Sequence, residues 1–169
     1  MQISKIELKN ISHYARGSEE TPCYNATVYV NGKKAIEVGN DGHGGMDRQD
    51  AWHEKGFNLK EINDWCIKTF GQKSFTYHSD DEEKECTYDC DLEQFCHDEL
   101  YKWLDSKLLK KDMNKKYLFV EDKKLYGYPR KNKDQDITFK TFFYEKHPSA
   151  KCLNFMSFDD ALTLYKESA

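Results

Sequence analysis

The sequence predicts an α+β fold, with an N-terminal antiparallel β-meander, two central helices, a C-terminal β-hairpin with a further strand, and a final helix. Three observations predict this order. Two strand-like runs flank an Asn-Gly pair near the start, apolar residues recur at helical spacing in the middle, and strands and helices follow in blocks instead of alternating. The 169 residues carry no low-complexity tract. We therefore expect one compact domain over 1–169.

The N-terminal meander is predicted from strand-like runs and the turn between them. Residues 2–9 alternate imperfectly between apolar and polar side chains, and Tyr24–Val30 is rich in β-branched and aromatic residues. Asn31 with Gly32 is the strongest two-residue signal for a hairpin, so 33–38 should return antiparallel. The polar segment 15–23 is expected to be a loop.

Two central helices are predicted from caps and apolar stripes. Asn58 begins a capping box and Gly71 is a natural C-cap, so a helix should lie between them. Asp91 can cap a longer helix that runs to about Met113. The segment 78–91 before it is expected to be an acidic connector. The apolar stripe of the longer helix is Leu92, Phe95, Cys96, Leu100, Trp103, Leu104 and Leu108.

The C-terminal part is predicted to contain a second hairpin, a strand and a helix. Residues 117–120 and 124–128 are strand-like and flank a three-residue turn. Residues 137–144 are β-branched and aromatic, which favours a strand. Ser157 is expected to cap the final helix. The residues of that helix expected to face inward are Phe158, Ala161, Leu162 and Tyr165.

Charge is unevenly distributed along the chain, although the net charge is only −4. Residues 1–101 hold 11 Lys/Arg and 20 Asp/Glu, whereas 102–151 hold 14 Lys/Arg and 7 Asp/Glu. The basic section can bind polyanions, pair with the acidic section, or form a solvated face. Basic and aromatic residues interleave over 123–133, but no RNA-binding motif accompanies them. Nucleic acid is therefore the less favoured partner.

Targeting features predict a cytoplasmic protein without a membrane partner. The N-terminal residues lack the apolar core of a secretory signal, and no apolar run has the length of a membrane span. In that setting the six cysteines are expected to be free thiols or metal ligands, not disulfides.

Four soft ligands within twelve residues make zinc the candidate cofactor: Cys86, Cys90, Cys96 and His97. Their spacing lacks the C-x2-C pairs of structural zinc sites. The adjacent Cys96 and His97 would also point about 100° apart on a helix. Ordinary free thiols are therefore the simpler interpretation.

The strongest candidate for a functional site is the glycine loop, defined here as 39–45, which directly follows a predicted strand. Four of the nine glycines lie in it. Its N–H groups could form a nest for a phosphate, although it has neither the Rossmann glycine pattern nor the ending of a P-loop. The alternative is a tight turn that needs positive φ angles. The residues predicted to bind a ligand are Ser18, Glu19, Thr21, Asn40, Asp41, Gly42, His43, Gly44, Gly45 and Arg48.

Acidic and histidine residues in 41–53 favour a second hypothesis, a metal-dependent nuclease or phosphoesterase. Its ligands would be Asp41, His43, Asp47 and His53. Their spacing matches no H-x-H or H-E-x-x-H pattern. The sequence also supplies no convincing set of nucleophile, base and oxyanion donors. Binding is therefore favoured over turnover.

Two motifs at a fixed separation resemble a pattern in small uncharacterised proteins of phages and bacteria. The motifs are Ser18-Glu19-Glu20-Thr21 with Cys23, and Asn40-Asp41-Gly42-His43-Gly44-Gly45. The resemblance covers about the first 45 residues and, more loosely, 115–156. That group has no settled activity, so no catalytic residue is carried over. The resemblance implies a phage-type accessory protein that counters host defence in the host cytoplasm. Its partner would be a nucleotide-like signal or a host defence protein, and its oligomeric state is left open.

Overall fold

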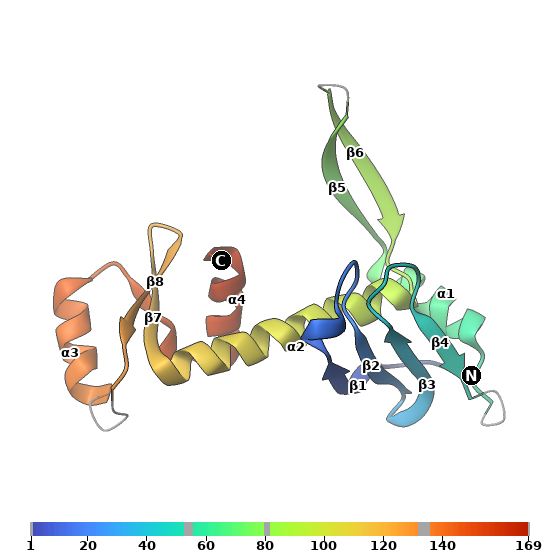
Figure 1. Cartoon of the computed structure of the whole chain (residues 1–169), viewed down its shortest axis with the longest axis horizontal. Coiled ribbons are helices and arrows are strands. Elements are labelled where there is room, and N and C mark those ends of the chain that lie inside the picture. Colours follow the sequence, from blue (N-terminus) through green and yellow to red (C-terminus); the bar gives the residue numbers. More distant parts are fainter. Residues whose placement is uncertain (1, 53–55, 80–81, 132–135, 169) are drawn as a thin grey trace. The chain divides into compact units, whose positions relative to one another are not determined.

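The computed structural model describes residues 2–52, 56–79, 82–131 and 136–168. Within these residues the chain forms four α-helices and nine strands, which confirms the α+β class (Figure 1). Its contacts gather into two compact units, Met1–Leu100 and Tyr101–Ala169. The acidic excess belongs to the first unit, with 11 Lys/Arg and 20 Asp/Glu, while the second holds 15 and 10. The single domain stays a prediction, and each unit is described by itself.

The first unit is built on a four-stranded antiparallel sheet in the order β1-β2-β3-β4. Its strands are β1 (Ile6–His13), β2 (Tyr24–Val30), β3 (Lys33–Asn40) and β4 (Arg48–Ala51). The predicted meander is thereby confirmed. The short fourth strand was not predicted, because its sequence Arg-Gln-Asp-Ala is polar and carries no apolar alternation.

The turn between β2 and β3 explains where the first strand begins. Asn31 and Gly32 have φ angles of 49° and 78°, as a tight hairpin requires. The Asn31 side chain accepts hydrogen bonds from the N–H groups of Ser4 and Lys5, at 2.9 and 3.1 Å. These residues are therefore held by the turn, and the ladder starts at Ile6, later than the sequence predicts.

Both central helices are confirmed, α1 (Leu59–Phe70) and α2 (Leu92–Lys115). Asn58 Oδ1 accepts from the N–H groups of Lys60 and Glu61, at 2.9 and 3.3 Å, and so caps α1. The predicted stripe of α2 holds in its first half, where Leu92, Cys96 and Leu100 are buried. The predicted stripe is wrong at its C-terminal end, where Leu108 is 46% exposed and Leu109 is fully buried. Leu109 packs with Leu118 and Leu153 in a core of the second unit, whereas Leu100 belongs to the first unit, so one stripe does not run along the whole helix.

The predicted acidic connector at 78–91 is wrong for the described residues 78–79 and 82–89, while 80 and 81 lie outside the described residues. Strands β5 (Gln72–Ser79) and β6 (Glu82–Asp89) form a hairpin whose register runs from Gln72 opposite Asp89 to Ser79 opposite Glu82. Aromatic contacts support it, since the rings of Phe75 and Tyr88 lie 6.0 Å apart between centroids. The charged side chains are compatible with strands because both are largely exposed to solvent. A run of acids therefore does not exclude strand pairing.

The second unit contains a three-stranded sheet in the order β8-β7-β9 and two helices. Strands β7 (Lys116–Glu121) and β8 (Lys124–Pro129) form the predicted hairpin, and β9 (Lys151–Cys152) pairs with β7. Helices α3 (Asp136–Lys146) and α4 (Phe158–Ser168) complete it. None of the described helices has both the length and the apolar character needed to cross a membrane.

The strand predicted at 137–144 is wrong, because these residues belong to α3. The aromatic residues that matter are spaced by four: Phe143 is fully buried, and Phe139 stacks on Tyr117 with ring centroids 3.7 Å apart. Residues four apart share one face of a helix, which is how both rings reach the sheet. Composition alone favoured a strand because β-branched and aromatic residues are enriched in strands. The buried face of a helix can hold the same residues, so composition did not exclude α3.

The final helix is confirmed in its cap and in its buried face. Ser157 Oγ accepts from the N–H of Asp160 at 3.2 Å. The buried residues Ala161, Leu162 and Tyr165 join a core with Leu109 and β7, and Phe158 packs against that core while only partly buried.

Candidate functional site

The glycine loop lies between β3 and β4 and needs its glycines for two reasons. Gly42, Gly44 and Gly45 have φ angles of 94°, 87° and 81°, in the region that other residues rarely adopt. A side chain on Gly42 would also overlap the Gly17 carbonyl, with Cβ only 2.8 Å from its carbon. The segment 15–23 therefore packs directly against the glycine loop. Gly42 O secures this contact by accepting from the N–H of Glu19 at 3.0 Å and from that of Glu20 at 2.9 Å.

Three N–H groups of the glycine loop are used inside the protein. Gly42 N donates to Asn40 Oδ1 at 2.9 Å, and His43 N donates to Asp41 Oδ1 at 3.1 Å. Gly44 N donates to Thr21 Oγ1 at 3.2 Å. These three donors have internal acceptors, so they do not form the open phosphate nest that the glycine spacing predicted.

Asn40 organises the loop from within. Its Oδ1 accepts from Thr21 Oγ1 at 2.6 Å as well as from Gly42 N. Its Nδ2 donates to Gly45 O and to Asp47 Oδ1, both at 3.2 Å. The side chain is buried and fully engaged, so Asn40 holds the loop in one conformation.

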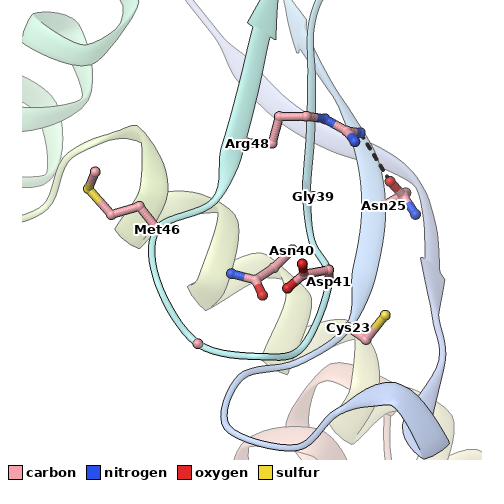
Figure 2. Close-up of a pocket in the computed structure, with 8 residues that line it drawn as sticks. Cys23, Asn25, Gly39, Asn40, Asp41, Met46 and Arg48 are labelled. Atoms are coloured by element: carbon pink, nitrogen blue, oxygen red, sulfur yellow. Dashed lines mark hydrogen bonds between the residues drawn. The ribbon is translucent and has the colours of Figure 1, made fainter.

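A cavity of about 470 Å³ opens beside the glycine loop (Figure 2). Within it, Arg48 donates to Asn25 Oδ1 at 3.2 Å, and the same guanidinium pairs with Asp50 at 2.9 Å. Sequence reasoning missed Asn25 as part of the site. The register could have indicated it, because Asn25 pairs with Gly39 across the hairpin. The cavity is lined by Cys23, Asn25, Gly39, Asn40, Asp41, Gly44, Met46 and Arg48.

Four predicted ligand-binding residues line this cavity, namely Asn40, Asp41, Gly44 and Arg48. The other six have different positions. Ser18 Oγ accepts from Cys23 N at 2.8 Å and orders the loop before β2. Glu19 and His43 pair at the surface, with 3.3 Å between Oε2 and Nδ1. The contacts of Thr21, Gly42 and Gly45 described above hold the loop itself.

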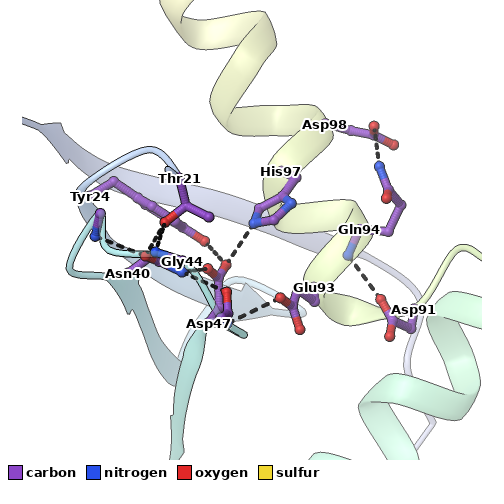
Figure 3. A network of polar contacts seen from close by, with 12 residues as sticks. Thr21, Tyr24, Asn40, Gly44, Asp47, Asp91, Glu93, Gln94, His97 and Asp98 are labelled. Carbon is purple, nitrogen blue, oxygen red and sulfur yellow. Dashed lines mark hydrogen bonds and ion pairs between the residues drawn. The ribbon is translucent and has the colours of Figure 1, made fainter. Parts of the chain in front are cut away.

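A second polar group surrounds Asp47, which lies two residues after the glycine loop (Figure 3). The side chain of Asp47 is only 1% exposed. Its carboxylate accepts hydrogen bonds from the Tyr24 hydroxyl and from Asn40 Nδ2, and His97 Nε2 lies 3.3 Å from its Oδ2. The backbone N–H of Asp47 donates to Glu93 Oε1 at 3.1 Å. The glycine loop is thereby joined to the first turns of α2.

The electrostatics of this polar group favour the charged forms of Asp47 and His97. Burial acts to raise the pKa of Asp47, but its contacts with His97, Tyr24 and Asn40 outweigh burial and lower that pKa. The interaction with Asp47 raises the pKa of His97 against the opposing effect of burial. Burial, and then the bond to Asp47, raises the pKa of the Tyr24 hydroxyl, which therefore remains a donor.

Potential metal ligands come together in a different combination from the two predicted ones. Within the described part of the chain, one oxygen each of Asp47 and Glu93 and one nitrogen of His97 lie within 4.8 Å of one another. Asp47 comes from the predicted acidic and histidine set, and His97 from the predicted zinc set. Glu93 was missed, because it lies 46 residues from Asp47 and only the tertiary fold brings them together.

The remaining members of the two predicted metal sets do not gather among the described residues. Cys86 is exposed on β6, whereas Cys90 and Cys96 are buried free thiols. Asp41 and His43 are exposed in the glycine loop. His53 lies outside the described residues.

Comparisons of this chain with protein-family models, with curated proteins and with solved structures find no match. The function is therefore argued from the geometry of the site. The resemblance to small phage and bacterial proteins stays a prediction.

Proposed function

We propose that this protein acts by binding a small phosphate-bearing ligand in the cavity between the glycine loop and Arg48. The observation that carries the proposal is the cavity itself, about 470 Å³, with a guanidinium in its wall. Ligand sites in proteins commonly enclose about 300–1,000 Å³. Arginine suits phosphate because its planar fork of N–H donors matches two phosphate oxygens.

The walls of the cavity supply further polar groups and are held in place before a ligand arrives. Asn25 and Asp41 offer an amide and a carboxylate, which suit the hydroxyl or base groups of a nucleotide. Asn25 also orients Arg48 through its hydrogen bond. The internal bonds of Asn40 order the loop, so binding does not have to order it. Arg48 thus takes the phosphate-binding role that the sequence assigned to the loop N–H groups.

In its wider form, the proposal makes the ligand a nucleotide signal and the protein a phage-type accessory protein that sequesters it in the host cytoplasm. This form rests on the resemblance of the two motifs around 18–23 and 40–45. The rival hypothesis for the same biological role is that this protein binds a host defence protein and no nucleotide.

The test is a thermal-shift and calorimetry screen with inorganic pyrophosphate and a panel of linear and cyclic nucleotides. We expect at least one probe to raise the melting temperature and to be recovered intact, because a ligand that binds the native state stabilises it. Arg48→Gln should abolish the shift. Lys34→Gln removes the same charge from the exposed start of β3 and should leave the shift unchanged.

Three outcomes would contradict the proposal: no shift with any probe, an equal shift in Arg48→Gln, or consumption of the bound probe. The last result would favour the phosphoesterase hypothesis. Capture of a single host protein without any nucleotide shift would favour the rival that binds a defence protein.

A further inference from the structure

We propose that Asp47, Glu93 and His97 bind one divalent metal ion between the glycine loop and α2. Their ligand atoms lie within 4.8 Å of one another, and all three residues belong to the first unit. Two carboxylates and one imidazole form a mixed oxygen and nitrogen set, which suits ions such as Mn²⁺, Fe²⁺ or Zn²⁺. The site goes beyond the proposed ligand binding, because it uses neither Arg48 nor Asn25.

The geometry requires only a small closure around an ion. Metal–ligand bonds to His and carboxylates are about 2.0–2.2 Å, so two ligands on opposite sides of an ion are about 4.0–4.4 Å apart. Glu93 and His97 are four residues apart on α2 and share one face of the helix. Asp47 faces them from the segment that follows the glycine loop (Figure 3). The side chain of Glu93 is partly exposed and long enough to move closer to an ion.

An unsatisfied nitrogen points to an absent ligand. His97 Nε2 is buried, and among the described residues it has no hydrogen-bond partner. It lies 3.3 Å from Asp47 Oδ2, which permits charge attraction without an aligned hydrogen bond. A metal ion on Nε2 would take the place of the proton in this ion pair and would be bound by both side chains.

Asp47 is held as metal-bound carboxylates usually are. The Tyr24 hydroxyl and Asn40 Nδ2 both donate to its oxygens. Such outer hydrogen bonds fix the direction of a ligand and are characteristic of metal sites. With Asp47 fixed, only the more exposed Glu93 has to adjust when an ion enters.

An ion can reach the site from solvent. Glu93 and His97 line a cavity of about 350 Å³, which leaves space for water ligands. Asp89 and Asp91 lie in the same wall and add negative charge. The whole unit carries a strong acidic excess. These charges raise the local concentration of cations around the opening.

The test is a titration of the chelator-treated full chain with Mn²⁺, in which the electron paramagnetic resonance signal of the free ion reports binding. We expect one ion per chain. Glu93→Gln keeps an acceptor for the Asp47 N–H but lowers ligand charge, and should weaken Mn²⁺ binding at least about tenfold. Glu85→Gln removes the same charge from exposed β6 and should bind as the wild type does.

Two further variants separate the ion site from folding and from the ligand cavity. His97→Gln should lose Mn²⁺ binding, with the melting temperature of the metal-free protein reporting whether it folds. Arg48→Gln should bind Mn²⁺ normally, so the ion site can fail or succeed independently of the proposed function. Absence of Mn²⁺ binding to the wild type, or equal affinity in Glu93→Gln, would overturn the proposal and leave an Asp47–His97 ion pair.

Discussion

Asn40 Nδ2 donates a hydrogen bond to Asp47 Oδ1 at 3.2 Å, and this bond joins the two candidate sites of the first unit. Asn40 lines the cavity that contains Arg48, while Asp47 belongs to the proposed ion site. The Asn40 amide also closes the glycine loop through Gly42 and Gly45. The order of the loop and the position of Asp47 therefore depend on the same side chain.

Asn40→Ala should lower the free energy of unfolding by about 2–3 kcal/mol, because it removes four hydrogen bonds, of which the two with Gly42 N and Asp47 Oδ1 are buried. Urea unfolding followed by circular dichroism would measure this change. Asp41→Ala is the matched control, since its side chain is exposed and accepts one described bond, from His43 N. It should cost less than about 1 kcal/mol. Equal losses in the two variants would show that Asn40 does not organise the loop.

Gly42→Ala should be more destabilising than Gly45→Ala. Both positions have positive φ, which costs an L-residue about 1–2 kcal/mol. At Gly42 the added Cβ would also collide with the Gly17 carbonyl, whereas at Gly45 it would meet no atom within 4 Å of the described structure. The collision should add about 1–3 kcal/mol to the loss. Comparison of the two unfolding curves isolates the contact between the loops, and identical curves would argue against it.

Alkylation by iodoacetamide should follow the burial of the thiols. Cys86 is exposed and should react first, whereas burial raises the pKa of Cys66 to about 12 and that of Cys152 to about 11. At pH 8 only about one in 10⁴ Cys66 thiols would be the reactive thiolate, and this fraction should grow tenfold with each pH unit. Mass spectrometry of protein digested after increasing reaction times would give the order in which the cysteines are alkylated. Early labelling of Cys66 in the native protein would contradict its burial.

Hydrogen exchange should be much faster in the β5–β6 hairpin than in β2 and β3. The central strands bury most of their side chains, whereas β6 exposes nearly all of its own. A two-stranded hairpin without cover is marginally stable and opens locally at low cost. Mass-resolved exchange over seconds to hours would show the difference. Protection equal to that of β2 would mean that something covers the hairpin.

Local signals allowed much of the fold to be predicted from the sequence. The turn at Asn31 and the caps at Asn58 and Ser157 were all confirmed, because each depends on bonds within a few residues. The errors at 78–91 and 137–144 have one cause. Strand and helix preferences there are decided by what the aromatic residues pack against, and composition does not contain that information.

The candidate site also has features that local sequence predicts and features that depend on the fold. The sequence by itself determined where the glycine loop lies and that it needs glycine, since positive φ is a local demand. Only the tertiary structure decided that the N–H of Gly44 donates to Thr21 Oγ1 across 23 residues and that Glu93 reaches Asp47 across 46 residues. The physical reason is that backbone conformation depends on neighbours in the chain, whereas hydrogen-bond partners and potential ligands are chosen by proximity after folding.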